Sequence, residues 1–159
     1  MRVGVRLGID VGKARIGVAK CDAHGMIATP VETVARDLEG STDIERIGAL
    51  IAEYEVIECV VGLPLNMQGQ HTASTDDALG FAHRIAALGT DVRLVDERLS
   101  TVTAWGQLHA TGKNHKKGRG VIDQAAAVVI LQHAIDAERL RGEPTGTVLP
   151  GTQQEETTS

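Results

Sequence analysis

The chain has few of the residues that build disulfide frameworks or zinc sites. Its two cysteines, Cys21 and Cys59, lie 38 positions apart without a CxxC pair, and its six histidines are scattered without an HxxxH motif. No apolar run approaches the roughly 20 residues that a membrane-spanning helix needs. Met1 leads straight into the first expected strand without a targeting leader. These absences predict a cytoplasmic protein with reduced, structural thiols and no membrane association.

Aromatic residues and positive charge are also scarce. Aromatics make up only 2% of the 159 residues, so a surface that stacks single-stranded bases on aromatic rings is not expected. The net charge of −5 is weak evidence against nucleic-acid binding, but residues 142–159 contribute three glutamates and no lysine or arginine. The remaining body carries only −2, so the distribution of charge matters more than its total. Acyl transfer has no support, because the chain contains no GxSxG motif.

What the chain does have is an acidic residue inside an apolar strand. Asp10 stands among Leu7, Ile9 and Val11, where burying a carboxylate is costly unless it is paired or binds a metal. One interpretation is therefore a metal ligand. The other is a turn aspartate, since Asp-x-Gly also begins hairpins. The strand alone does not decide between them.

The pattern of apolar and polar residues predicts one α/β domain over residues 1–141. Three strands in succession form an antiparallel meander, helix and strand then alternate twice to add two parallel strands, and two helices follow. The expected architecture is therefore a mixed five-stranded sheet flanked by helices. Residues 142–159, rich in Pro, Gly, Thr, Gln and Glu, are predicted to form a disordered tail. The expected strands are 2–12, 16–21, 26–34, 56–61 and 91–95, and the expected helices are 41–54, 74–88, one from Ser100, and 121–141.

Further carboxylates stand at the ends of other expected elements. Asp96 and Glu97 follow the strand 91–95. Asp123 lies in the first turn of the last expected helix, where it could also serve only as a partner of the helix dipole. Carboxylates that converge from separated stretches are what Mg²⁺ or Mn²⁺ requires, because hard cations take oxygen ligands. The candidate ligands are Asp10, Glu97 and Asp123, and it stays open whether Asp96 joins them.

A basic segment precedes the last expected helix. Residues 111–120 hold Lys113, Lys116, Lys117 and Arg119, with glycines among them. This composition predicts a flexible loop whose cations neutralise the phosphates of a substrate. Simple solvated charge is the alternative interpretation.

Four motifs together resemble the YqgF/RuvX family, and the similarity covers about residues 3–138 in order. The motifs are Gly8-Ile9-Asp10-Val11-Gly12 with Ile16-Gly17-Val18-Ala19, then Val61-Gly62-Leu63-Pro64-Leu65-Asn66, then Asp96-Glu97-Arg98-Leu99-Ser100-Thr101, and Lys117-Gly118 leading to Asp123. The resemblance implies an RNase H-like fold related to that of Holliday junction resolvases. It also implies that Asp10, Glu97 and Asp123 form the family's acidic triad.

That family is linked to maturation of the 5′ end of pre-16S ribosomal RNA and is described as resolving Holliday junctions. The resemblance therefore implies a metal-dependent endonuclease acting on pre-16S rRNA or on branched DNA, with a homodimer expected for the two-fold junction. Two metal ions about 4 Å apart would activate water and stabilise the leaving oxygen. Arg98 and Asn66 are further candidates for substrate contact, although each could instead serve its own loop.

Two functions from other classes stay open. The domain could bind nucleic acid, or a transcription or ribosome-assembly partner, without cutting anything, although the three acids speak against this. The Asp-x-Gly sequence at Asp10 could also belong to an actin-like or sugar-kinase ATPase, whose fold is related. Such enzymes enclose the nucleotide between two domains, and 159 residues supply one.

Overall fold

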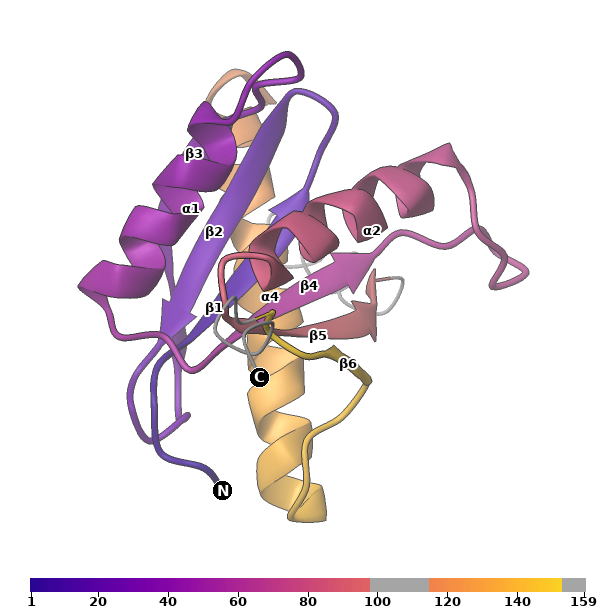
Figure 1. The fold of residues 1–159 in the computed structure, drawn as a ribbon. Helices are drawn as coiled ribbons and strands as arrows, with labels where there is room; N and C mark the ends of the chain where they lie inside the picture. Colours follow the sequence, from indigo (N-terminus) through magenta and orange to yellow (C-terminus); the bar gives the residue numbers. More distant parts are fainter. Residues whose placement is uncertain (98–114, 153–159) are drawn as a thin grey trace, which may run out of the picture.

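The computed structural model describes residues 1–97 and 115–152, with the backbone alone for residues 115–123. These residues contain a six-stranded sheet of order β3-β2-β1-β4-β5-β6 (Figure 1). Strand β1 lies in the middle, antiparallel to β2 on one side and parallel to β4 on the other. The strands are β1 Arg6–Val11, β2 Arg15–Cys21, β3 Ala28–Ala35, β4 Glu58–Leu63, β5 Asp91–Asp96 and β6 Thr147–Leu149.

The mixed sheet is confirmed, with one strand more than the five predicted. β3 continues the antiparallel meander, β4 and β5 run parallel to β1, and β6 pairs antiparallel with β5. Strand β6 falls within residues 142–159, so the prediction of a disordered tail does not hold for Thr147–Leu149, while residues 153–159 lie outside the described part. A strand of three residues has too few positions to show an alternating pattern, which is why the sequence did not predict it.

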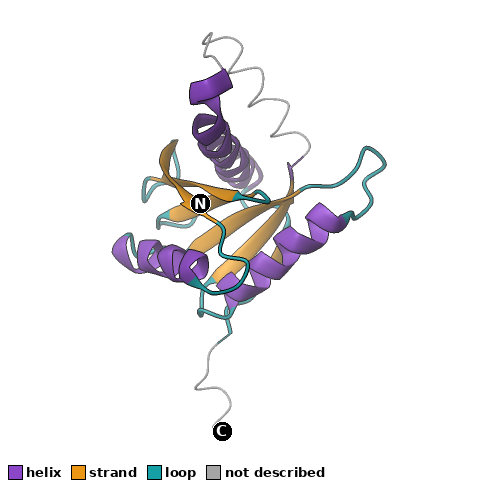
Figure 2. Ribbon diagram, turned by 90° about the horizontal axis from the view of Figure 1, so that it is seen from above, coloured by secondary structure: helices purple, strands orange, loops and turns teal. Residues whose placement is uncertain are grey.

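Helices cover both faces of the sheet (Figure 2). Helices α1 (Thr42–Glu53) and α2 (Ala73–Ala86) pack on one face, and α4 (His115–Arg141) packs on the other. The helix predicted from Ser100 belongs to residues 98–114, which the structure does not describe. Among the described helices, none is long and apolar enough to cross a membrane.

Helix α4 lies close against β1 because of Gly8. A Cβ added to Gly8 would come within 2.5 Å of the carbonyl oxygen of Ala127 and 2.7 Å of the Cβ of Leu131. Any side chain at this position would push the helix off the sheet. Further along α4, Glu138 reaches Arg6, near the start of β1. The helix therefore runs antiparallel to β1 and directs its amino end toward the carboxyl end of that strand.

Helix α4 begins at His115, six residues before the start predicted at Val121. The prediction of a flexible loop is therefore wrong for residues 115–120, and Asp123 is the ninth residue of the helix instead of a member of its first turn. Each glycine in a helix costs about 1 kcal/mol. Extending an existing helix avoids the cost of nucleation, however, and the later turns of α4 are anchored by a buried face.

Candidate active site

Strand β1 presents Asp10 on the face of the sheet that α4 covers. Its neighbours Ile9 and Val11 are buried on the opposite face, with α1 and α2. The alternate residues Arg6 and Gly8 both contact α4. Because side chains alternate along a strand, Asp10 belongs with Arg6 and Gly8. It is half-buried at the carboxyl end of the strand.

Glu97 approaches the same place from β5, across Gly62 of β4. Ile9 pairs with Val61 in the parallel register of β1 and β4, so the next position along sets Asp10 beside Gly62. A Cβ added to Gly62 would lie 3.3 Å from the Cβ of Glu97. The missing side chain of this glycine thus leaves room for Glu97 on the α4 face, and two of the predicted site carboxylates flank one glycine.

The end of β5 separates the two consecutive acids that the sequence left ambiguous. Leu94 is buried toward α1 and α2, whereas Val95 packs toward α4. Asp96 follows the alternation of Leu94 and is exposed, while Glu97 is half-buried against Gly62. This arrangement favours Glu97 over Asp96 as the neighbour of Asp10.

The backbone of α4 carries position 123 toward these acids. Ala127 lies against Gly8, and residue 123 is one helical turn closer to the carboxyl end of β1. The side chain of Asp123 is not among those that the structure describes. Among the side chains that are described, no group of three His, Cys, Asp or Glu residues gathers as a metal-binding cluster.

A hydrogen bond fixes this part of α4 on the sheet. The Nε2 amide of Gln124 donates to the Oγ1 of Thr33 on β3 at 2.9 Å. Thr33 pairs with Gly17 of β2, and Gly17 pairs with Asp10 of β1. The residue next to Asp123 is therefore attached to the row of the sheet that contains Asp10.

The predicted phosphate-binding residues are described only in part. Lys116, Lys117 and Arg119 lie on the first turns of α4, where the helical backbone alone is described. Lys113 and Arg98 lie in the stretch between residues 97 and 115, outside the described part. Contact of these five residues with substrate stays a prediction.

Asn66 organises the loop between β4 and α2. Its Oδ1 accepts hydrogen bonds from the backbone N–H groups of Gln68 and Gln70 at 3.0 and 2.8 Å. Its backbone N–H donates to the carbonyl of Gln70 at 3.0 Å. These bonds are what the loop-shaping interpretation of Asn66 requires, and its contact with substrate stays a prediction.

Arg36 supports the turn that follows Asp10, and the sequence did not reveal this role. Its side chain is only 7% exposed, and its guanidinium donates to the carbonyl of Gly12 at 2.8 Å and to both oxygens of Asp77 at 2.8 and 2.9 Å. The hydrogen bond from Arg36 lowers the pKa of the Asp77 carboxyl. The backbone N–H of Arg36 also donates to the carbonyl of Ala14. Arg36 therefore ties the turn that follows Asp10 to helix α2.

The other end of the same face holds a network of ion pairs. Glu138 of α4 accepts from Arg2 at 2.6 Å and from Arg6 at 3.1 Å. Glu58 of β4 accepts from Arg2 and from Arg93 of β5 at 3.1 and 3.0 Å. The hydrogen bond from Arg2 lowers the pKa of Glu138 to about 2.

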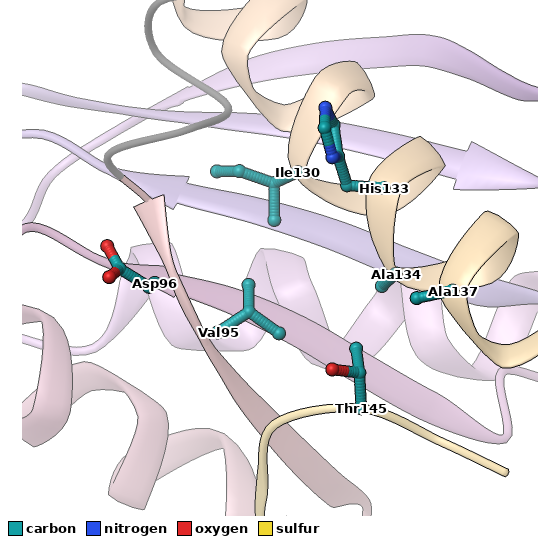
Figure 3. Close-up of a pocket in the computed structure, with 7 residues that line it drawn as sticks. All are labelled: Val95, Asp96, Ile130, His133, Ala134, Ala137 and Thr145. Atoms are coloured by element: carbon teal, nitrogen blue, oxygen red, sulfur yellow. The ribbon is translucent and has the colours of Figure 1, made fainter. Parts of the chain in front are cut away.

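Two cavities flank the end of β5. One, of about 210 Å³, opens between β5 and α4, with Asp96 and Val95 on the strand and His133 on the helix (Figure 3). The other, of about 510 Å³, opens on the side of α2 and includes Leu79 of that helix. Asp96 lines both cavities.

The mixed sheet with helices on both faces has an RNase H-like fold. The solved structure of Thermus thermophilus RuvC in complex with a Holliday junction substrate is similar, with a TM-score of 0.56 and 15% sequence identity. The likeness covers 91% of this chain and 99% of that one. A second structure of Thermus thermophilus RuvC matches with a TM-score of 0.54 and 18% identity.

The chain belongs to the RuvX family, whose model is described as Holliday junction resolvase and matches residues 4–137. A protein of Clavibacter sepedonicus with the name "Putative pre-16S rRNA nuclease" is 60% identical over 94% of each chain. A protein of Streptomyces coelicolor with the same name is 52% identical, over 92% of this chain and 88% of its own length. The family and these relatives identify the chain as a nuclease.

Proposed function

We propose that this nuclease is a metal-dependent endonuclease that hydrolyses phosphodiester bonds with Asp10, Glu97 and Asp123 as its acidic triad. The observation that carries the proposal is the approach of Asp10 and Glu97 on either side of Gly62, on the face of α4. Carboxylates that gather at one edge of a sheet supply the oxygen ligands that a divalent cation requires. A module that only binds nucleic acid would gain nothing from this pair.

The donor set fits a divalent metal. Carboxylate oxygens are the ligands that Mg²⁺ and Mn²⁺ prefer, and Gly62 leaves the space between the two strands free of a side chain. When bound there, two such ions would activate the attacking water and stabilise the leaving oxygen. Asp10 and Glu97 would hold them from the ends of β1 and β5, which flank β4 in the sheet, and strands fix ligand positions better than loops do.

The chain's own residues would do the rest. Arg36 would keep the turn after Asp10 in place through the carbonyl of Gly12. Lys116, Lys117 and Arg119, with Lys113 and Arg98, would neutralise the phosphates of the substrate. Because phosphate contacts carry no sequence information, these cations would position a strand without selecting its bases.

The substrate we propose is the precursor of 16S ribosomal RNA, cleaved at its 5′ end in the cytoplasm. The name that similar proteins carry, "Putative pre-16S rRNA nuclease", supports this substrate, and the similarity covers 94% of this chain. Holliday junctions are the second candidate, favoured by the description of the family. A homodimer would suit a junction, whose two strands are cut symmetrically, whereas a monomer would suffice for one RNA end.

The experiment compares both substrates with one preparation. A precursor rRNA fragment and a four-way DNA junction are incubated with the protein in Mg²⁺, Mn²⁺, Ca²⁺ or excess chelator. Cleavage is expected with Mg²⁺ or Mn²⁺ and not with Ca²⁺, because the longer bonds and looser geometry of Ca²⁺ disturb a two-ion site. Undiminished cleavage in chelator would overturn the metal mechanism, and sedimentation with each substrate would decide between monomer and dimer.

A further inference from the structure

The larger cavity at the end of β5 has the form of a binding site. It measures about 510 Å³, within the range of about 300–1,000 Å³ that small-molecule sites occupy. Its walls come from β4, α2, β5 and the segment that leads into β6. The residues that line it are Leu63, Leu65, His71, Leu79, Leu94, Val95, Asp96, Thr145, Gly146 and Thr147.

The chemistry of the lining is apolar inside and polar at the edge. Leu63 and Leu79 are half-buried and pack on the core of the α1 and α2 face, so the cavity wall is continuous with the core. Asp96, His71 and Thr147 are exposed at its rim. Among the described residues that line the cavity there is no lysine or arginine, and Asp96 is acidic. A phosphate group is therefore a poor occupant.

The cavity and the proposed catalytic acids lie on opposite sides of one strand end. Asp96 lines the cavity, and Glu97, the next residue, stands against Gly62 on the α4 face. Because Asp96 and Glu97 are consecutive, a nucleic-acid strand that passes the end of β5 with a phosphate at Glu97 would bring a neighbouring base within reach of Asp96. An unpaired base offers two apolar faces for leucine side chains and N–H groups on its edge for a carboxylate acceptor.

We propose that this cavity holds one unpaired nucleobase of the substrate, next to the phosphate that is cut, with Asp96 accepting a hydrogen bond from the edge of the base. The inference rests on the proposed nuclease function and deepens it. A fully paired duplex cannot supply such a base without opening. The cavity thus selects a strand that is single-stranded beside the cleavage site, as the end of a precursor RNA can be.

The test fills the cavity from its rim. Thr147→Trp adds a large side chain at an exposed cavity residue, and Val148→Trp, the next residue of β6 and no part of the cavity lining, is the matched control. Binding of a single-stranded RNA is measured by fluorescence anisotropy, with an abasic nucleotide moved one position at a time along it. Melting temperatures establish that both variants are folded, and Asp96→Asn serves as a second variant that leaves the volume unchanged.

In the wild type, one abasic position is expected to weaken binding roughly tenfold, the order of magnitude of the contribution of one bound base. Thr147→Trp should weaken binding of the intact RNA by a similar factor and should no longer respond to the abasic position, since the two changes remove one interaction. Val148→Trp should bind like the wild type. The inference would be overturned if both tryptophan variants bound the RNA equally well, or if no abasic position weakened binding. Either result would also be expected if the cavity binds a protein side chain instead of a base.

Failure of this inference can be told apart from failure of the proposed function. If the wild type cleaves RNA but Thr147→Trp binds and cleaves normally, the proposed nuclease function is supported and the proposal of a base-binding cavity is wrong. If binding by the wild type depends on the abasic position but no substrate is cleaved, the base-binding cavity is supported and the proposed metal-dependent hydrolysis is wrong.

Discussion

Strand β1 carries a charged residue toward each end of the face that α4 covers, and the two ends treat charge differently. At the amino end, Arg6 is 1% exposed and pairs with Glu138, so each buried charge has an opposite partner. At the carboxyl end, Asp10 and Glu97 bring two like charges together across Gly62. The first arrangement stabilises the fold. The second gathers the two carboxylates to which the proposed function assigns the cations.

An apolar layer keeps the two ends apart. Gly8 and Val60 lie between them on the α4 face, beneath Ile130 and Leu131 of the helix. From Arg6 to Asp10 the strand advances about 13 Å, at roughly 3.3 Å per residue. Arg6 and Asp10 are therefore held apart on one face of the sheet, and α4 covers both ends.

The largest effect is expected at the carboxyl end, from Asp10→Asn. The change removes a ligand charge with little change of volume, so kcat should fall by roughly a thousandfold, equivalent to about 4 kcal/mol. The free energy of unfolding without metal should stay unchanged or rise, because a like-charge repulsion is removed. Single-turnover cleavage and urea unfolding measure the two quantities. The control is Asp136→Asn, which changes a half-buried acid of helix α4 in the same way. If Asp10→Asn cleaved at the wild-type rate, Asp10 would be a turn residue and not a metal ligand.

At the amino end, Glu138→Gln should have the reverse profile. It leaves Arg6 buried without its opposite charge, which costs about 3 kcal/mol of unfolding free energy. Cleavage at temperatures where the variant is folded should change little. The matched control is Glu143→Gln, which breaks an exposed pair with Arg141 and should cost no more than about 0.5 kcal/mol. Equal losses in the two variants would mean that the network adds no more than a surface pair.

Acid titration sharpens the same comparison. The pKa of Glu138 is about 2, against an ordinary value of 4.5. A carboxyl group whose pKa is lower in the folded state contributes stability above its unfolded pKa and loses that contribution as the pH falls through its folded pKa. Wild-type unfolding free energy should therefore fall between about pH 4.5 and pH 2 more steeply than that of Glu138→Gln. Urea unfolding at a series of pH values measures both slopes, and parallel curves would contradict the assignment to Glu138.

The two ends also differ in how far the sequence could predict them. Asp10 could be predicted as a site residue from its local sequence, because a carboxylate in an apolar strand is anomalous. Asp96 and Glu97 could be predicted because they stand at the end of another expected strand. The ion network gave no local signal, since Arg2 and Glu138 are 136 positions apart. Long-range pairing of this kind depends on where α4 docks, which Gly8 decides through its contact with Ala127.

The missed helical turns have a different physical origin. Gly118 and Gly120 lower helix propensity, so the basic segment was predicted as a loop, yet the backbone from His115 continues α4. The low helix propensity of these glycines is outweighed because the segment extends a helix that packing already holds in place. The sequence did not predict the short strand β6 because this strand depends on pairing with β5 and has no alternating pattern of its own.

The smallest effect is expected from the cations at the start of α4. If Lys116 and Lys117 neutralise substrate phosphates, replacing both with Ala should weaken binding and reduce the slope of log affinity against log salt by roughly two units on duplex DNA. Sequence preference and cleavage at saturating substrate should change little, because phosphate contacts position a strand without reading it. The matched control is the double alanine variant of Arg139 and Arg141, which removes the same charge from the far end of the same helix, beside the ion network. Salt titrations of binding compare the three proteins. Equal slopes for the wild type and the Lys116 and Lys117 variant would mean that these lysines do not contact substrate phosphates. An equal loss of affinity in both double variants would mean that the effect comes from net charge and not from the position of the lysines near the carboxyl end of β1.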